Sequence, residues 1–98
     1  MKRVRLQSPA DVDYVQALEW YEKKQPGLGR EFDAELLALF ERIKHDAEFF
    51  QKETDFVRKA RMPRFKHLIY YTVDDNEIGV VAIWHPSRNP DDLRRRFA

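Results

Sequence analysis

The segment "RFKHLIYYTVDDNEIGVVAIW", Arg64–Trp84, decides the fold, because it holds two strand-like runs that one short turn can join. In the first run, alternate residues share one face of an extended chain. These residues are Phe65, His67, Ile69, Tyr71 and Val73. The residue types of Asp74–Asn76 favour a hairpin turn. Glu77–Trp84 is apolar on both faces, which predicts a central strand that helices cover on at least one side.

Two further strands are predicted before this hairpin. Phe56–Met62 alternates in the same way, and Pro63 separates it from the hairpin. Val4–Ser8 also alternates and is short, which is typical of an edge strand.

Two helices are predicted between these strands. Ser8 can cap the first helix with its hydroxyl, with Pro9 at the first helical position and Asp11 three residues after the cap. Its apolar residues recur at helical spacing at Val12, Tyr14, Val15, Leu18 and Tyr21. Pro26 and two glycines in "KKQPGLG" force a turn. The apolar stripe of the second helix is Leu28, Phe32, Leu36, Leu39, Phe40, Ile43 and Ala47.

The order is therefore β-α-α-β-β-β in a single α+β domain over residues 1–98. We predict an antiparallel sheet of about four strands with an N-terminal helical hairpin packed on one face. The other face is expected to stay partly open, and the tail "DDLRRRFA" can form one helical turn.

Composition excludes several classes of protein. The chain has no cysteine, so neither a disulfide framework nor a thiolate zinc site is possible. It has no membrane-length apolar run and no signal-like N-terminus, which predicts a cytoplasmic protein. The net charge is only +1, but residues 56–73 carry five basic residues and no acidic one. The second half of the chain therefore presents a local positive field.

Basic side chains are the main candidates for a binding site. They are Arg58, Lys59, Arg61, Arg64, Lys66, Arg88, Arg94, Arg95 and Arg96. Arginine suits the recognition of phosphate or carboxylate, so an anion site on the open face is one interpretation. The other interpretation is that these residues form structural ion pairs or serve as solubilising surface charges.

The three histidines differ in their surroundings. His85 follows the last strand between aromatic and proline residues, and its titration range suits acid–base chemistry. His67 shares a face with apolar residues and is expected to be half-buried and hydrogen-bonded, whereas His45 is expected on the surface. Trp20 and Trp84 are expected in the core. The spacing of the three histidines predicts no metal site, and no cofactor motif is present.

Two segments together resemble a known group of proteins. They are "WYEKKQPGLGREFDAEL", Trp20–Leu36, and "VRKARMPRFKHLIYYTVDDNEIGVVAIWHPSRNPDDLRRR", Val57–Arg96. The chain resembles the RelE/ParE superfamily of toxins from bacterial type II toxin–antitoxin systems, and in particular its ParE-like, plasmid-stabilisation members. The resemblance implies a growth-inhibiting toxin that a cognate antitoxin holds inactive in a hetero-oligomer. The antitoxin-binding residues that it implies on the helical hairpin are Tyr14, Leu18, Tyr21, Phe32 and Leu36.

The superfamily has two kinds of target, so the resemblance implies two alternatives. A RelE-like member would be a ribosome-dependent mRNA endoribonuclease, in which Arg61 and Arg64 stabilise the phosphate, His85 transfers a proton and Arg88 assists. A ParE-like member would inhibit DNA gyrase without cleaving nucleic acid, and those residues would then bind the target. Further target-binding residues in either case would be Arg58, Lys59, Lys66, Arg94 and Arg95.

We favour gyrase inhibition over RNA cleavage, and whether the protein is an enzyme stays open. The near-neutral charge is low for a nuclease that must bind the ribosome, and the tail lacks the tyrosine of several nuclease members. A third alternative is a degenerate member that only binds antitoxin. None of the three requires a cofactor.

Overall fold

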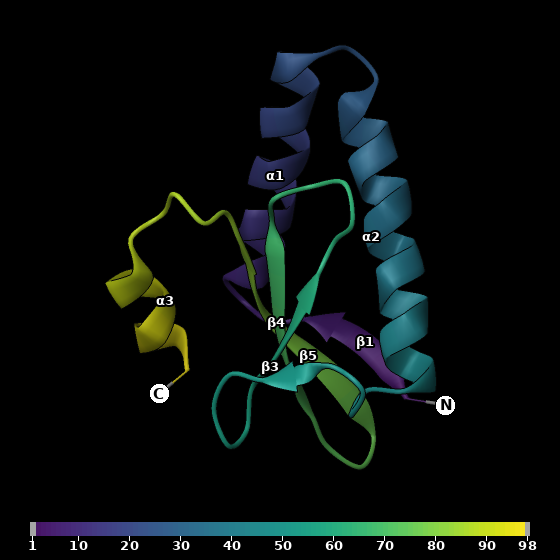
Figure 1. The fold of residues 1–98 in the computed structure, drawn as a ribbon, viewed down its shortest axis with the longest axis vertical. Helices are drawn as coiled ribbons and strands as arrows, with labels where there is room; N and C mark the ends of the chain where they lie inside the picture. Colours follow the sequence, from purple (N-terminus) through teal and green to yellow (C-terminus); the bar gives the residue numbers. More distant parts are fainter. Residues whose placement is uncertain (1, 98) are drawn as a thin grey trace.

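The computed structural model describes residues 2–97 and confirms the predicted α+β class and order of elements (Figure 1). The strands are β1 Arg3–Leu6, β2 Gln51–Lys52, β3 Arg58–Arg61, β4 Leu68–Val73 and β5 Glu77–Trp84. The helices are α1 Ala10–Lys24, α2 Leu28–His45 and α3 Pro90–Arg96. Within the described residues, no helix has the length and apolar character needed to cross a membrane.

The sheet has five strands in the order β1-β5-β4-β3-β2, one more than predicted. The additional strand, β2, has only two residues, both polar and exposed, so no alternation could reveal it. The sheet is also not antiparallel throughout, because β1 runs parallel to β5, with Val4 opposite Ile78. Strand direction at an edge is set by the chain's path through the two helices, which a local pattern does not encode.

The hairpin of β4 and β5 forms as predicted. The Asp74 carboxylate accepts hydrogen bonds from the backbone N–H groups of Asn76 and Glu77, each at 2.8 Å. This local bonding is why an aspartate suits the turn. A register shift between Tyr70 and Tyr71 interrupts the ladder. β5 is buried along nearly its whole length, as its apolar pattern indicates.

The helices α1 and α2 pack on one face of the sheet over the larger hydrophobic cluster. The α2 stripe is confirmed, with Phe32, Leu36 and Ile43 fully buried. The α1 stripe is partly wrong: Val12 and Val15 are each 50% exposed, and Asp13 is buried instead. The helix α1 is rotated about its axis so that Asp13 faces the interior, because the carboxylate finds hydrogen-bond partners there, as described below. The predicted Ser8 cap is also wrong, since Pro9 occupies the cap position and no side chain caps the helix.

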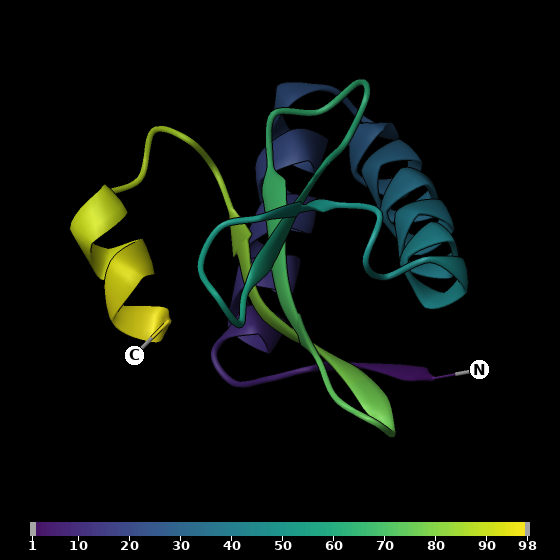
Figure 2. The same ribbon diagram turned by 60° about the horizontal axis from the view of Figure 1, so that its bottom comes forward.

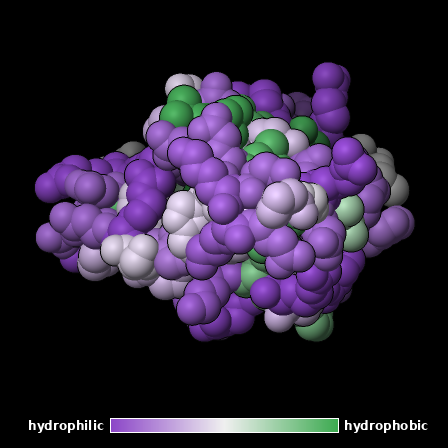
Figure 3. Space-filling view, turned by 90° about the horizontal axis from the view of Figure 1, so that it is seen from above, coloured by the Kyte–Doolittle hydropathy of each residue, from purple (hydrophilic) through white to green (hydrophobic). Residues whose placement is uncertain are grey.

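Glu22 closes the connection between α1 and α2. Its carboxylate accepts hydrogen bonds from the backbone N–H groups of Gly27, at 3.0 Å, and Gly29, at 3.1 Å. Gly27 has a φ of 90°, which favours glycine, and a Cβ on Gly29 would lie 2.8 Å from the Leu18 carbonyl oxygen. The molecule is mainly hydrophilic when this end is seen from above (Figure 3).

The short helix α3 packs on the other face of the sheet, away from α2 (Figure 2). Leu93 is buried there in a smaller cluster with Tyr70, Val81 and Trp84. The tail thus forms a longer helix than the single turn predicted, and it covers part of the face that was expected to be open.

Candidate functional site

Three of the predicted binding cations are committed to structural contacts. Arg64 forms ion pairs with Glu31, at 2.9 Å, and Glu35 of α2. Arg58 donates two hydrogen bonds to the backbone carbonyls of Glu48 and Phe50. Lys59 lies 3.5 Å from a carboxylate oxygen of Glu53. These contacts tie α2 and the region around β2 to the sheet.

Arg88 and Arg96 meet at a buried carboxylate, that of Asp13 on α1. One Asp13 oxygen accepts from Arg88 at 3.1 Å and from Arg96 at 3.0 Å, and the other accepts from the Ile83 N–H at 3.0 Å. Burial opposes ionisation of Asp13, but the hydrogen bonds from Arg96, Ile83 and Arg88 outweigh it, so the pKa of the carboxyl lies below its usual value. We call this arrangement of Asp13, the Ile83 N–H, Arg88 and Arg96 the Asp13 clasp.

The clasp exists because β1 ends before β5 does. The last backbone bond on this edge is from the Gln7 N–H to the Val80 carbonyl, so the Ile83 N–H has no strand partner and finds Asp13 instead. The two arginines also lie over Trp84, with Cζ atoms 3.7 and 4.9 Å from a ring centroid. Arg96, which the sequence placed among the basic candidates without a partner, thereby anchors α3 to α1.

The remaining predicted cations are exposed. Arg61 lies opposite Leu68 in the β3–β4 ladder. Its side chain points to the α3 side of the sheet, because neighbouring side chains on a strand alternate and that of Ala60 is buried on the other side. Arg94 and Arg95 pair with Asp91 and Asp92 one helical turn away. Lys66 is exposed in the β3–β4 connection.

His67 and His85 line a small pocket at the end of β5, which we call the histidine pocket. It has a volume of about 160 Å³ and is also lined by Ala17, Trp20, Ile83 and Ser87. The His67 ring is more buried than the half-buried position predicted, and its Nδ1 lies 2.9 Å from the Tyr21 hydroxyl, which agrees with the predicted hydrogen bonding. Trp20 was expected in the core, but it is 38% exposed.

The two histidines are both hard to protonate in the folded protein. Burial, and then the nearby His85, lowers the pKa of His67 from 6.5 to about 4. Burial, and then the charges of Lys66 and Lys24, lowers the pKa of His85. No group of three or more metal-binding side chains occurs within residues 2–97.

The four residues that a nuclease would use differ in their surroundings. Arg64 is engaged by α2, Arg88 by Asp13 and Trp84, and Arg61 lies on the other face of the sheet. His85 has its Nε2 atom buried and without a hydrogen-bond partner.

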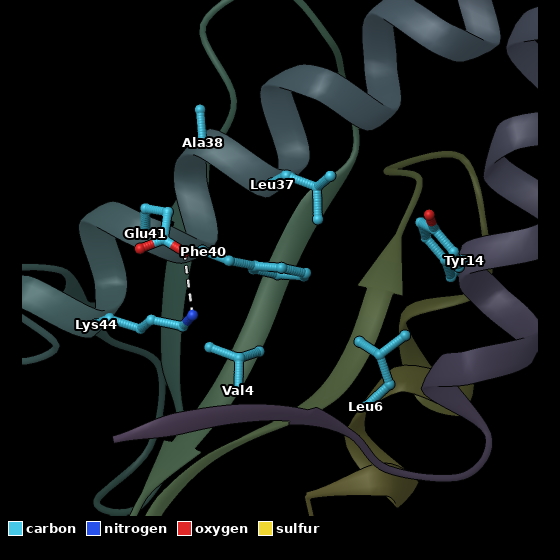
Figure 4. Close-up of a pocket in the computed structure, with 8 residues that line it drawn as sticks. All are labelled: Val4, Leu6, Tyr14, Leu37, Ala38, Phe40, Glu41 and Lys44. Atoms are coloured by element: carbon cyan, nitrogen blue, oxygen red, sulfur yellow. Dashed lines mark hydrogen bonds and ion pairs between the residues drawn. The ribbon is translucent and has the colours of Figure 1, made fainter. Parts of the chain in front are cut away.

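A second candidate site is a groove between β1 and α2 (Figure 4). Its volume is about 580 Å³, and Val4, Leu6, Leu37 and Phe40 give it apolar walls. Tyr14 stands at one end and donates a hydrogen bond to Asp33, which raises the pKa of its hydroxyl to about 12. The ion pair of Glu41 and Lys44 lies at the other end.

The groove runs beside an unpaired strand edge. Because the Gln7 N–H points to β5, the backbone groups of Arg3 and Arg5 point there too, and those of Val4 and Leu6 point outward. The groove thus offers apolar walls and free backbone hydrogen-bonding groups together.

Most of the predicted antitoxin-binding residues are not on the surface. Tyr21, Phe32 and Leu36 are buried in the core of the chain itself, and Leu18 is partly buried against it. Tyr14 alone lines the groove. Sequence reasoning did not single out the β1 and outer α2 residues that line the groove, although Leu37, at 52% exposed, breaks the polar pattern of its helix face.

The fold defines the class of protein. It is similar to a solved structure described as a chromosomal ParDE TA system from P. aeruginosa, with a TM-score of 0.74 over 87% of this chain and 96% of that chain. The two sequences are 16% identical, so this likeness shows the shared fold. No curated protein sequence matches the chain.

The family follows from the sequence match. Residues 4–90 match the family model described as the ParE toxin of type II toxin–antitoxin systems, parDE. Since the match covers most of the chain, the protein belongs to this toxin family, and the resemblance predicted from its sequence is confirmed. Nearly all of α3 lies beyond the matched residues.

Proposed function

We propose that the protein arrests growth in the cytoplasm by inhibiting DNA gyrase without cleaving nucleic acid, and that a cognate antitoxin prevents this by binding along β1. The observation that carries the first part is the commitment of Arg64 and Arg88 to carboxylates within a ParE toxin chain. RNA cleavage needs a proton acceptor and positive charge at one phosphate. Arginines that already pair with a buried carboxylate or with carboxylates on a helix are poorly suited to stabilise the charge of a reacting phosphate.

The target-binding surface in this proposal is the exposed basic side of the sheet and α3. Arg61, Lys66, Arg94 and Arg95 supply its charge. Arg58 and Lys59, which the sequence also suggested, contribute through the shape of the β2–β3 region because their charged groups are bound internally.

The experiment compares two activities of the purified protein. We expect it to inhibit the supercoiling of relaxed plasmid by gyrase and to leave ribosome-bound mRNA intact. Arg61→Glu should weaken gyrase inhibition, while the charge-matched control Arg30→Glu, at an exposed position on α2, should not. Cleavage of mRNA that disappears in Arg61→Ala and His85→Ala would establish the RelE-like alternative. Normal growth on expression without antitoxin would leave only a degenerate antitoxin-binding member.

The antitoxin in this proposal places an extended segment beside β1 and apolar side chains in the groove. Its backbone would pair with the outward groups of Val4 and Leu6, as in strand addition to a sheet edge. The resulting assembly is a toxin–antitoxin hetero-oligomer.

A pair of matched variants tests this binding surface. Leu37→Asp places a charge in the groove, whereas Val15→Asp places one at an equally exposed apolar position on α1 outside it. We expect Leu37→Asp to abolish rescue by the antitoxin and Val15→Asp to preserve it. Equal loss of rescue in both variants would contradict the groove as the antitoxin site.

A further inference from the structure

The histidine pocket has a hydrogen-bond donor whose identity the structure fixes. The Ser87 backbone N–H lies 3.0 Å from Nδ1 of His85, and the Ser87 hydroxyl oxygen lies 2.7 Å from it. A backbone N–H can only donate, so Nδ1 accepts, and the neutral ring carries its proton on Nε2. A protonated Nε2 cannot ligate a metal ion, which leaves hydrogen-bond donation as the chemistry of this atom.

This donor is buried and has no partner in residues 2–97. Such a group costs on the order of 1–3 kcal/mol relative to a satisfied one, and most buried polar groups in native structures have a hydrogen-bond partner. The ring lies against Trp20, at 4.8 Å between centroids, and His67, at 5.1 Å. Trp20 is 38% exposed and His67 is buried, so Trp20 is the neighbouring ring that solvent reaches.

The charges around the pocket favour an anion. Lys66 and Lys24 are close enough to oppose protonation of His85, and the Lys24 Nζ lies 3.8 Å from the Trp20 ring centroid. Asp13, the acidic residue of the pocket lining, is already neutralised by Arg88 and Arg96. An entering anion would therefore meet one N–H donor and the positive field of two nearby ammonium groups.

The size and walls of the pocket favour a carboxylate on a short apolar stem. Ala17, Ile83 and Trp20 form apolar walls, and the volume is about 160 Å³. One carboxylate oxygen can accept from Nε2 while the other faces the lysines. A phosphate dianion would need several converging donors, and the pocket offers one buried N–H.

We infer that the histidine pocket binds the side-chain carboxylate of a glutamate from a protein partner, with His85 Nε2–H as the donor and Trp20 as a movable cover. The site lies at the end of β5, apart from the β1 groove. It is tested with the isolated protein, so its result does not depend on gyrase inhibition.

The first test is an NMR titration of the wild-type protein that follows the imidazole and indole nitrogens. Propionate and N-acetyl-glutamate N-methylamide should each give a saturable shift at His85 Nε2 and at Trp20, with His45 unchanged. The same shifts with sodium chloride at equal ionic strength would show screening only and would overturn the proposal. Tighter binding of inorganic phosphate than of propionate would overturn the carboxylate assignment. Binding of propionate but not of the glutamate derivative would overturn the assignment to a partner's side chain.

Variants then test the named groups. His85→Phe should abolish the saturable Trp20 shift, whereas His45→Phe, at an exposed histidine, should leave it intact. Lys66→Gln should weaken binding by roughly twofold to fivefold, the range of an exposed charge contact. Trp20→Ala should tighten binding, because it uncovers the donor. Unchanged affinity in His85→Phe would overturn the proposal, and the wild-type titration decides the matter if that variant does not fold.

Discussion

The two faces of the sheet are held by different means. Under α1 and α2, apolar side chains such as Phe32, Leu36 and Tyr71 are fully buried in the larger cluster. Under α3 the cluster is small, and the Asp13 clasp holds the helix by hydrogen bonds and charge. Apolar burial is non-directional and adds up with area, whereas a carboxylate between two arginines depends on one residue. The faces should therefore respond differently to mutation, pH and salt.

Truncating the larger core should have the greatest effect. Phe32→Ala removes a fully buried ring packed against Tyr21 and Phe65, and should lower the free energy of unfolding by about 3–5 kcal/mol. Leu93→Ala under α3 should cost about 2 kcal/mol, at the low end for such changes. Urea denaturation measures both. Equal costs would show that the two faces are not held differently.

Removing the clasp should open α3 locally rather than unfold the whole protein. Asp13→Ala leaves two arginines and the Ile83 N–H without their acceptor, and should cost about 3 kcal/mol. Hydrogen exchange should show α3 amides opening while those of α2 stay protected, and Trp84 should become accessible to a fluorescence quencher. The control is Asp11→Ala, at an exposed carboxylate on the same helix. Uniform loss of protection over both helices would contradict a separate clasp.

The elements that local patterns encode were predictable, and those that long-range partners determine were not. The β4–β5 hairpin and the α2 stripe follow from alternation, turn chemistry and helical spacing. The clasp could not be predicted, because Asp13 looks like a solvated helix residue until Ile83 and Arg96, 70 and 83 residues away, are placed beside it. The same limit misplaced Val12 and hid the ion pairs of Arg64, since its partners Glu31 and Glu35 lie on another element.

The pH dependence of stability should separate the two faces. His67 lies on the face of the sheet that α1 and α2 cover. Its pKa is about 4 in the folded protein against 6.5 in the unfolded chain. The unfolded state thus binds a proton first as the pH falls. The contribution is complete above about pH 6.5 and is lost as the pH falls to about 4, which amounts to about 3 kcal/mol.

The Asp13 clasp should survive this first loss. The pKa of Asp13 lies below its usual value of 3.8, so its stabilisation is present above that value and disappears only at lower pH. Urea midpoints between pH 7 and 4 should fall in the wild type and change much less in His67→Phe. If the α3 amides lost their protection from hydrogen exchange before the urea midpoint fell, the predicted order would be reversed.

The smallest effect is expected at Arg64, whose charge contacts lie on the surface. Its side chain is 55% exposed and pairs with Glu31 and Glu35 of α2, where water and salt screen the attraction. Arg64→Ala should therefore shift the urea midpoint only slightly, and the shift should vanish at high salt. The proposed gyrase inhibition should be preserved, because this guanidinium links the β3–β4 connection to α2. The matched control is Arg5→Ala, which removes a similarly exposed arginine paired with Glu77. A salt-independent loss of stability, or loss of toxicity in a stable Arg64→Ala protein, would show that Arg64 does more than join these elements.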